Sequence, residues 1–343
     1  MKDLGDDFQQ AIASAREMAQ PLSIVGTGSK RGLTGDPNSS EGRLLNTVEH
    51  TGIVDYRPDE LVVTVRTGTP IKELNQALAR EGQMLGFEPP EYRGLGTVGG
   101  AVAAGIAGPG RAWRGGARDA VLGVQMINGL GQRLNFGGQV MKNVAGFDVS
   151  RLQAGAFGML GLLLEVSLKV LPLPQSEQTL RLELDAADAH ARMLKWTLEP
   201  QPITATAWHD GALWVRLSGA EAAVSQAGAA IGGELQPDNG FWAMLKDHGL
   251  PLFRSGPIAC RHLPPASPLD QEDQLLEWNG ARRWTAAEVT VGGYQPYSDG
   301  YARFRCRDGG GDPVVAQYQA RIKAAFDPDN LFNPELTDAD VAA

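Results

Sequence analysis

The sequence has few cysteines and histidines, which limits the chemistry it can carry. Only Cys260 and Cys306 occur in 343 residues, and the five histidines are not clustered. Neither set has the spacing of a zinc site or an iron–sulfur cluster. The G-x-S-x-G pattern of serine hydrolases is also absent from the sequence. We therefore predict no metal site and no serine nucleophile.

Long apolar runs and an excess of positive charge are missing as well. No window approaches the roughly 18 apolar residues of a membrane span, so no direct span is expected. The first residues are acidic and lack the layout of a signal peptide, which favours the cytoplasm. The formal net charge of −9 argues against nucleic acid as a partner, because binding to its phosphates needs a basic face.

Glycine is abundant, with 43 residues, and the stretch 94–161 is dense with it. Such bunching indicates tight turns and close approach of backbone to a ligand. Gly94 to Gly99 match G-x-G-x-x-G, the dinucleotide fingerprint of a Rossmann fold. That fold needs a strand just before the motif, and Pro89 and Pro90 stand there instead. We reject it in favour of a small-residue turn that enters a short helix over 100–105 and brings amides to a pyrophosphate.

The apolar pattern is of the α+β type, since short strands are not separated regularly by long helices. We expect a helix over 8–18 and a second helix that starts with Thr69 as its N-cap. The expected strands span 21–25, 43–47, 60–66, 121–128, 131–136 and 162–171.

Pro172-Leu-Pro174 indicates a domain boundary. Beyond it, Asp210-Gly211 and Asn279-Gly280 each predict a β-hairpin, and 314–326 a closing helix. The expected domains are 1–174, an antiparallel α+β domain over 175–312, and a C-terminal segment over 313–343. Six of the seven tryptophans follow Lys195; most are expected in a core, with Phe241-Trp242 as a surface element.

Several segments together resemble the FAD-binding domain of the vanillyl-alcohol-oxidase (PCMH-type) family over about residues 20–172. They are Gly96–Gly105, Arg114–Asp119, Gly137-Gly138, Lys142–Asp148, Arg151-Leu152 and Gly155–Gly161. Phe326–Pro334 resembles the motif with which that family returns to the FAD domain. Within the family, the chain is most similar to FAD-binding subunits of bacterial glycolate oxidases. The implied fold is a PCMH-type FAD-binding domain of two α+β subdomains, with an antiparallel α+β cap domain.

The resemblance implies a set of FAD contacts. The first pyrophosphate loop is Gly26, Thr27, Gly28, Ser29 and Lys30. Small residues after a strand can direct several N–H groups at an anion. An ordinary turn without a ligand would have the same sequence pattern. The second turn is Gly96, Thr97, Val98, Gly99 and Gly100, with Gly105 at its end. Gly158, Gly161 and Val166 are expected near the adenosine or ribityl part, and Pro90 beside the flavin.

Three arginines in the same region, Arg111, Arg114 and Arg118, could bind phosphate or a substrate carboxylate. Exposure in a solvated loop or contact with a partner chain would explain the three arginines equally well. We include Arg114 among the predicted FAD contacts. Relatives with covalent flavin attach it through histidine or cysteine. Between Thr51 and Ala259 the sequence has no such residue outside the second domain, so FAD is expected to be noncovalent.

Two departures from the family's pattern bear on function. Ala104 and Phe157 stand near positions where relatives carry polar residues. The H-x-G-D-G-N-x-H segment of related catalytic dehydrogenases is absent, and we assign no catalytic residue; His262, near Arg254 and Arg261, is the best of the five histidines.

Three functions remain open. The preferred one is an FAD subunit that depends on a catalytic FAD-containing glycolate oxidase subunit and an iron–sulfur subunit, with a peripheral place at the inner membrane through these partners. The second is a self-sufficient 2-hydroxy-acid dehydrogenase, which needs a base and an arginine from the second domain at the flavin. The third is a structural subunit that no longer binds flavin.

Overall fold

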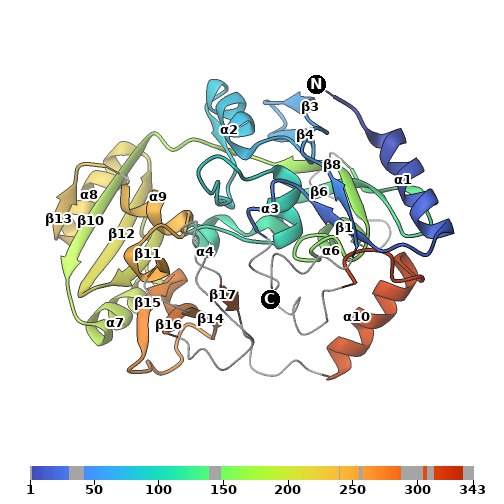
Figure 1. The fold of residues 1–343 in the computed structure, drawn as a ribbon. Helices are drawn as coiled ribbons and strands as arrows, with labels where there is room; N and C mark the ends of the chain where they lie inside the picture. Colours follow the sequence, from blue (N-terminus) through green and yellow to red (C-terminus); the bar gives the residue numbers. More distant parts are fainter. Residues whose placement is uncertain are drawn as a thin grey trace. The chain divides into compact units, whose positions relative to one another are not determined.

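The computed structural model describes residues 2–30, 42–138, 148–238, 240–254, 258–286, 304–306 and 313–334. The chain divides into two compact units (Figure 1). Unit 1 comprises Met1–Ile106, Gly116–Pro172 and Gly310–Ala343, and unit 2 comprises Ala107–Gly115 and Leu173–Gly309. Among the described residues, no helix is long and apolar enough to cross a membrane.

A five-stranded antiparallel sheet is the centre of unit 1. Its order is β3 (Ile53–Arg57), β4 (Val62–Arg66), β8 (Leu162–Lys169), β6 (Val121–Ile127) and β7 (Arg133–Gly137). The middle strand β8 lies between β4 and β6, and none of its residues is exposed, although Glu165, Ser167 and Lys169 are polar. Two small sheets complete the unit: parallel β1 (Leu22–Val25) with β2 (Arg43–Asn46), and β5 (Gln83–Met84) with β9 (Leu171–Pro172).

The helices of unit 1 are α1 (Gly5–Glu17), α2 (Ile71–Arg80), α3 (Val98–Ala104), α5 (Ala117–Ala120), α6 (Val149–Leu152) and α10 (Pro313–Phe326). The N-terminal helix expected from the sequence is confirmed as α1. Phe8, Ile12 and Ala15 recur at the helical period, so they form one buried face. That face packs against Leu22 of β1 and against Phe332 near the end of the chain.

The predicted cap of α2 is wrong. Pro70 is the N-cap residue and its side chain accepts no capping hydrogen bond, while the Thr69 hydroxyl accepts a hydrogen bond from the Gly52 N–H at 2.8 Å. Thr69 is fully buried, so its oxygen serves a tertiary contact instead of the helix end. The buried face of α2 is formed by Ile71, Leu74 and Leu78, which are all fully buried.

Unit 2 is built on an eight-stranded sheet of order β13-β10-β12-β11-β15-β16-β14-β17. In chain order its strands are β10 (Ser176–Glu183), β11 (Ile203–His209), β12 (Ala212–Gly219), β13 (Glu234–Gln236), β14 (Ile258–His262), β15 (Asp273–Glu277), β16 (Arg282–Ala286) and β17 (Phe304–Cys306). Its helices are α4 (Arg111–Arg114), α7 (Ala186–Trp196), α8 (Glu221–Ile231), α9 (Gly240–Lys246), and the 3₁₀ turns Pro251–Arg254 and Trp278–Gly280. Both predicted hairpins are confirmed: β11 pairs with β12 and β15 with β16.

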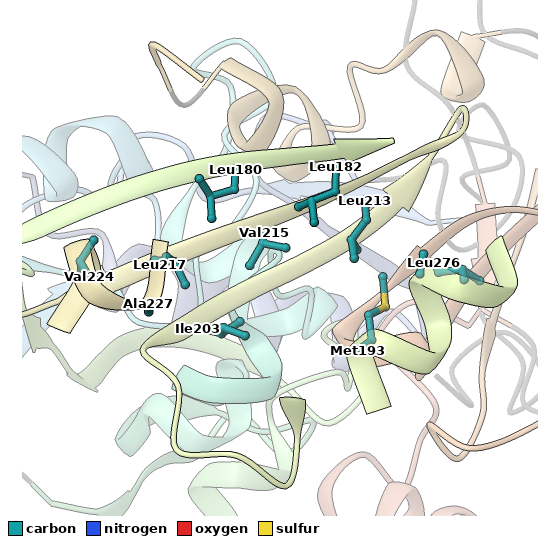
Figure 2. Close-up of a cluster of buried hydrophobic side chains, with 11 residues drawn as sticks. Leu180, Leu182, Met193, Ile203, Leu213, Val215, Leu217, Val224, Ala227 and Leu276 are labelled. Atoms are coloured by element: carbon teal, nitrogen blue, oxygen red, sulfur yellow. The ribbon is translucent and has the colours of Figure 1, made fainter. Parts of the chain in front are cut away.

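The two faces of this sheet bury different side chains (Figure 2). Leu213, Val215 and Leu217 alternate along β12 and pack with Met193 of α7 and Val224 of α8. The residues between them point to the opposite face, as the period of a strand requires.

On that opposite face, Trp214 stacks on Phe241 of α9 with ring centroids 4.1 Å apart. Phe241 and Trp242 are only 8% and 3% exposed, so their expected place at the surface is wrong; they are part of the core. The broader expectation for the tryptophans is confirmed, because none of the six after Lys195 is exposed.

His50 gives unit 1 a dependence on pH. Its ring is 1% exposed, with Nδ1 accepting the Leu4 N–H at 3.0 Å and Nε2 3.1 Å from the Leu164 carbonyl oxygen. This arrangement requires a neutral ring with its hydrogen on Nε2. Burial lowers the pKa of His50, and Arg66 and Arg133 lower it further against the opposing charge of Asp3.

Because the folded pKa lies below the unfolded one, this stabilisation is complete above about pH 6.5 and is lost as the pH falls below it. We expect wild type to lose more stability than His50→Gln between pH 7.5 and 5.5, by at most about 1.4 kcal/mol per pH unit. Thermal melting of both proteins at the two pH values measures this. His248, whose pKa burial also lowers, is present in both and cancels. Equal losses in the two proteins would contradict the assignment.

Candidate FAD-binding site

The first loop of the site leaves β1 at Val25 and covers residues 26–30. The strand before it is fixed, because the Ile24 N–H donates to Asn333 Oδ1 at 2.7 Å. Gly28 has a φ of 78°, which favours glycine. The backbone N–H groups of residues 26–29 find no acceptor in the part of the chain that the structure describes. Successive unpaired amides of this kind form a concave donor set for an anion.

The second turn, at the start of α3, uses its backbone amides within the chain. The Val98 N–H donates to the Thr69 carbonyl at 2.9 Å and the Gly99 N–H to the Thr67 carbonyl at 2.8 Å. The Gly100 N–H donates to the Thr97 side chain at 3.2 Å. These three amides already have partners within the chain, and the anion-binding role expected of this turn stays a prediction.

The second turn also lets the backbone come close to the first loop. A Cβ placed on Gly26 would lie 2.9 Å from Thr97 Oγ1, and one on Gly100 would lie 3.0 Å from the same atom. A side chain at Gly26 would therefore push the two turns apart, and one at Gly100 would displace the Thr97 side chain within the second turn. The Thr97 hydroxyl is the point where the first loop and α3 meet.

Lys30 adds a positive charge beside this junction. Its ammonium nitrogen lies 5.2 Å from the centre of the Tyr92 ring and 3.7 Å from the position that a Gly100 Cβ would take. An ammonium group next to unpaired amides favours a phosphate ligand over a neutral one.

A third segment, residues 153–161, packs on the other end of α3. The Gly155 N–H donates to the Val102 carbonyl at 3.1 Å, and the Phe157 N–H donates to the Ala103 carbonyl at 2.8 Å. The Phe157 carbonyl accepts a hydrogen bond from Asn333 Nδ2 at 2.6 Å. These bonds set the distance between the turn and α3.

The three segments enclose a cavity of about 80 Å³. Its wall is formed by Ile24, Gly26, Thr47, Thr67, Gly99, Gly100, Ala103, Gln153, Phe157, Gly158, Gly161, Leu162 and Leu163. Pockets that bury a whole drug-sized ligand measure roughly 300–1,000 Å³, so this one can take only part of a dinucleotide.

Five of the predicted site glycines, Gly26, Gly99, Gly100, Gly158 and Gly161, meet in this wall. The other predicted residues of unit 1 lie around it. Pro90 is buried, as are Gly96, Thr97 and Val98 of the second turn, and Gly105 ends α3. Thr27 donates its hydroxyl hydrogen to the Leu95 carbonyl, which ties the first loop to the segment before α3.

Two predicted contacts are not brought to the cavity. Val166 is fully buried in the middle of β8, between Val65 and Val124, and is absent from the wall. Arg114 belongs to unit 2, where its guanidinium donates to Ser218 Oγ at 3.3 Å and lies 3.7 Å from a Glu177 carboxylate oxygen. Residues 107–115 of the glycine-rich stretch therefore belong to the other unit, which the sequence did not reveal.

Sequence reasoning missed the apolar and polar parts of the wall. Thr47, Thr67, Gln153, Leu162 and Leu163 come from four separate segments and share no motif. Gln153 offered the one usable signal, as a long polar side chain inside a turn of small and apolar residues.

These features suit an anionic dinucleotide. The first loop supplies unpaired N–H groups and a lysine, the glycines admit a ligand close to the backbone, and Gln153 Nε2 is a buried donor without an acceptor among the described residues. The residues present therefore fit FAD.

A family model described as an FAD binding domain matches residues 5–137. Glycolate oxidase subunit GlcE of Escherichia coli (strain K12) is 42% identical over 342 residues, covering 96% of this chain and 97% of that protein. The chain belongs to the GlcE family of FAD-binding oxidoreductase subunits.

More distant relatives share only part of the chain. Glycolate oxidase subunit GlcD of Bacillus subtilis (strain 168) is 28% identical over 59% of this chain and 42% of its own length. The solved structure of an alkyldihydroxyacetonephosphate synthase covers 95% of this chain and 73% of its own, with a TM-score of 0.69 at 15% identity. The latter shows the fold alone, and it supports the expected α+β, PCMH-type class.

Thr97→Val tests the junction of the two turns. Valine keeps the shape of threonine and removes the acceptor of the Gly100 N–H, so we expect a loss of about 0.5–2 kcal/mol in the free energy of unfolding. We also expect less FAD per purified chain, because the start of α3, which packs against Gly26 through Thr97, loses its cap. Denaturant melts and the flavin-to-protein absorbance ratio measure both. Thr97→Ser, which keeps the hydroxyl, is the control; if it behaves like the valine variant, the hydroxyl is not responsible.

Proposed function

We propose that this chain is the FAD-binding subunit of a multi-subunit glycolate oxidase that converts glycolate to glyoxylate. The observation that carries the proposal is the similarity to GlcE, which extends over nearly the whole of both chains. FAD, when bound, supplies a ring that can take up a hydride and pass electrons on. The chain's own residues would bind and orient it. The amides of residues 26–29 and Lys30 would hold its diphosphate, in the space that the absence of side chains at Gly26 and Gly100 leaves free.

The chemistry on glycolate belongs, in this proposal, to a partner. Oxidation of a 2-hydroxy acid needs a base for the hydroxyl proton and a cation for the carboxylate. The H-x-G-D-G-N-x-H segment is absent, and four of the histidines have structural contacts. His50 and His248 are buried, His190 Nε2 lies 2.6 Å from the Pro265 oxygen, and His209 Nδ1 lies 3.0 Å from the Gln274 oxygen.

His262, the candidate base, lies in unit 2 and stacks on Trp278 with ring centroids 5.4 Å apart. Arg282 of unit 2 is also held by its neighbours. Arg282 lies between the rings of Trp278 and Trp284, 4.6 and 4.4 Å from their centres, and 3.7 Å from a Glu277 oxygen. These contacts favour a partner-dependent subunit over a self-sufficient dehydrogenase.

The further parts of the proposal concern electron flow. A catalytic FAD-containing subunit would oxidise glycolate, this chain's FAD would relay electrons or support that subunit, and an iron–sulfur subunit would carry electrons onward. The complex would be held peripherally at the inner membrane through these partners.

Anaerobic addition of glycolate to the purified chain tests the proposal. We expect a yellow protein whose flavin absorbance stays unchanged alone and bleaches when the partner subunits are present. D-lactate in place of glycolate is the substrate control. Bleaching of the isolated chain would make it a dehydrogenase in its own right. A chain that is colourless both alone and in the complex would make it a structural subunit.

Noncovalent attachment is a separate expectation. His50, the one histidine in unit 1, has both ring nitrogens engaged with the Leu4 and Leu164 backbone. Acid denaturation should therefore release all the FAD into the supernatant, as measured by its fluorescence. Flavin that stays with the precipitated protein would contradict this expectation.

A further inference from the structure

Gln153 has an unusual position in the cavity wall. It follows α6 directly, and its side chain is 1% exposed. The backbone around it is fixed, because its N–H donates to the Ser150 carbonyl and its own carbonyl accepts from the Ala156 N–H, both at 3.3 Å. The side-chain nitrogen Nε2 is fully buried and has no hydrogen-bond acceptor among the described residues.

Such an atom requires an explanation. Folded proteins pair nearly all of their buried polar groups, and an unpaired amide in an apolar setting loses its bonds to water without replacement. The wall around Gln153 offers little in return. Thr67 Oγ1 already donates to the Leu163 carbonyl at 2.7 Å and Thr47 Oγ1 to the Val25 carbonyl at 3.3 Å. Most of the remaining side chains of the wall are apolar.

The same wall contains Gly26 and Gly100, the two glycines that meet at Thr97 beside Lys30. A ligand that enters between these glycines brings acceptor oxygens into the cavity that Gln153 lines. An amide nitrogen can only donate, so its partner must be an acceptor.

We propose that Gln153 is an FAD-contacting residue, whose Nε2 donates a hydrogen bond to an oxygen of the FAD diphosphate. This assignment rests on the proposed FAD binding of the chain. Without the cofactor, Nε2 has no hydrogen-bond acceptor among the described residues, and with FAD bound it has one. Gln153 therefore lowers the stability of the apoprotein and raises the affinity for FAD.

Gln83 provides a matched control in the same unit. It is also buried, at 7% exposure, but both ends of its amide are paired. Its Oε1 accepts from the Tyr56 hydroxyl at 2.9 Å and its Nε2 donates to the Pro58 carbonyl at 2.7 Å. Replacing each glutamine by methionine, which has a similar length and no amide, therefore removes an unpaired group in one case and a paired group in the other.

The experiment uses the full chain after removal of FAD. Titration with FAD gives the dissociation constant from the quenching of flavin fluorescence. Thermal melts of the apoprotein give its stability. For Gln153→Met we expect about tenfold weaker FAD binding, equivalent to about 1.4 kcal/mol, and an apoprotein that melts at the wild-type temperature or higher. For Gln83→Met we expect a lower apoprotein melting temperature and an unchanged dissociation constant. Gln153→Glu should bind FAD more weakly than Gln153→Met, because its charge would face the diphosphate.

The outcomes separate this assignment from the proposed function. If wild type and Gln153→Met bind FAD with equal affinity, the assignment of Gln153 is overturned and the proposed FAD binding stands. A Gln153→Glu variant that binds as well as Gln153→Met would overturn the diphosphate as the partner. Wild type that binds no FAD would overturn the proposed FAD binding and the assignment together. If Gln153→Met does not fold, Gln153→Glu against wild type still decides the question.

Discussion

Asn333 holds the cofactor cavity together from the far end of the chain. Its Oδ1 accepts the Ile24 N–H and its Nδ2 donates to the Phe157 carbonyl, while its own N–H donates to the Leu22 carbonyl. The side chain is 5% exposed, so these bonds are not exchanged with water. One amide thus fixes the strand before the donor loop relative to the turn on the opposite wall. The strand pairing alone would not set that spacing, since β1 pairs with β2 and, through Leu22, with Phe332, and neither pairing includes Phe157.

The residues before Asn333 show why it can do this. Asp327, 1% exposed, accepts hydrogen bonds from the Leu331 and Phe332 N–H groups and from Lys323 Nζ. The same ammonium donates to the Met159 carbonyl at 2.8 Å, so the end of α10 is joined to the segment that contains Gly158. The buried charge of Asp327 is compensated by three donors, as a buried carboxylate requires. The closing segment is therefore a structural part of the site and not an appendage to it.

The sequence predicted those features that depend on local backbone chemistry. The hairpins at Asp210-Gly211 and Asn279-Gly280, the helix α1 and the turn into α3 follow from residues next to one another. The errors have the opposite character. The Thr69 hydroxyl was assigned to the cap of α2, but its partner is the Gly52 N–H, which approaches it only in the folded chain. Phe241 was expected at the surface because nothing in its neighbourhood reveals that Trp214 stacks on it.

The polar groups of the two units differ in how they are paired, and this difference bears on which unit can bind a ligand. In unit 2, Arg283 is fully buried and donates to the Gly280 carbonyl at 3.0 Å, with Asp273 at 3.3 Å, and Arg282 lies between two indole rings. Groups held in this way stabilise a core and are poorly placed to follow a substrate through a reaction, because moving them would leave buried charges unpaired. In unit 1, by contrast, the amides of residues 26–29 and the Gln153 side chain keep donor capacity that the described protein does not use. The described donors around this cavity of unit 1 therefore suit an anionic cofactor, while Arg282 and Arg283 serve the core of unit 2.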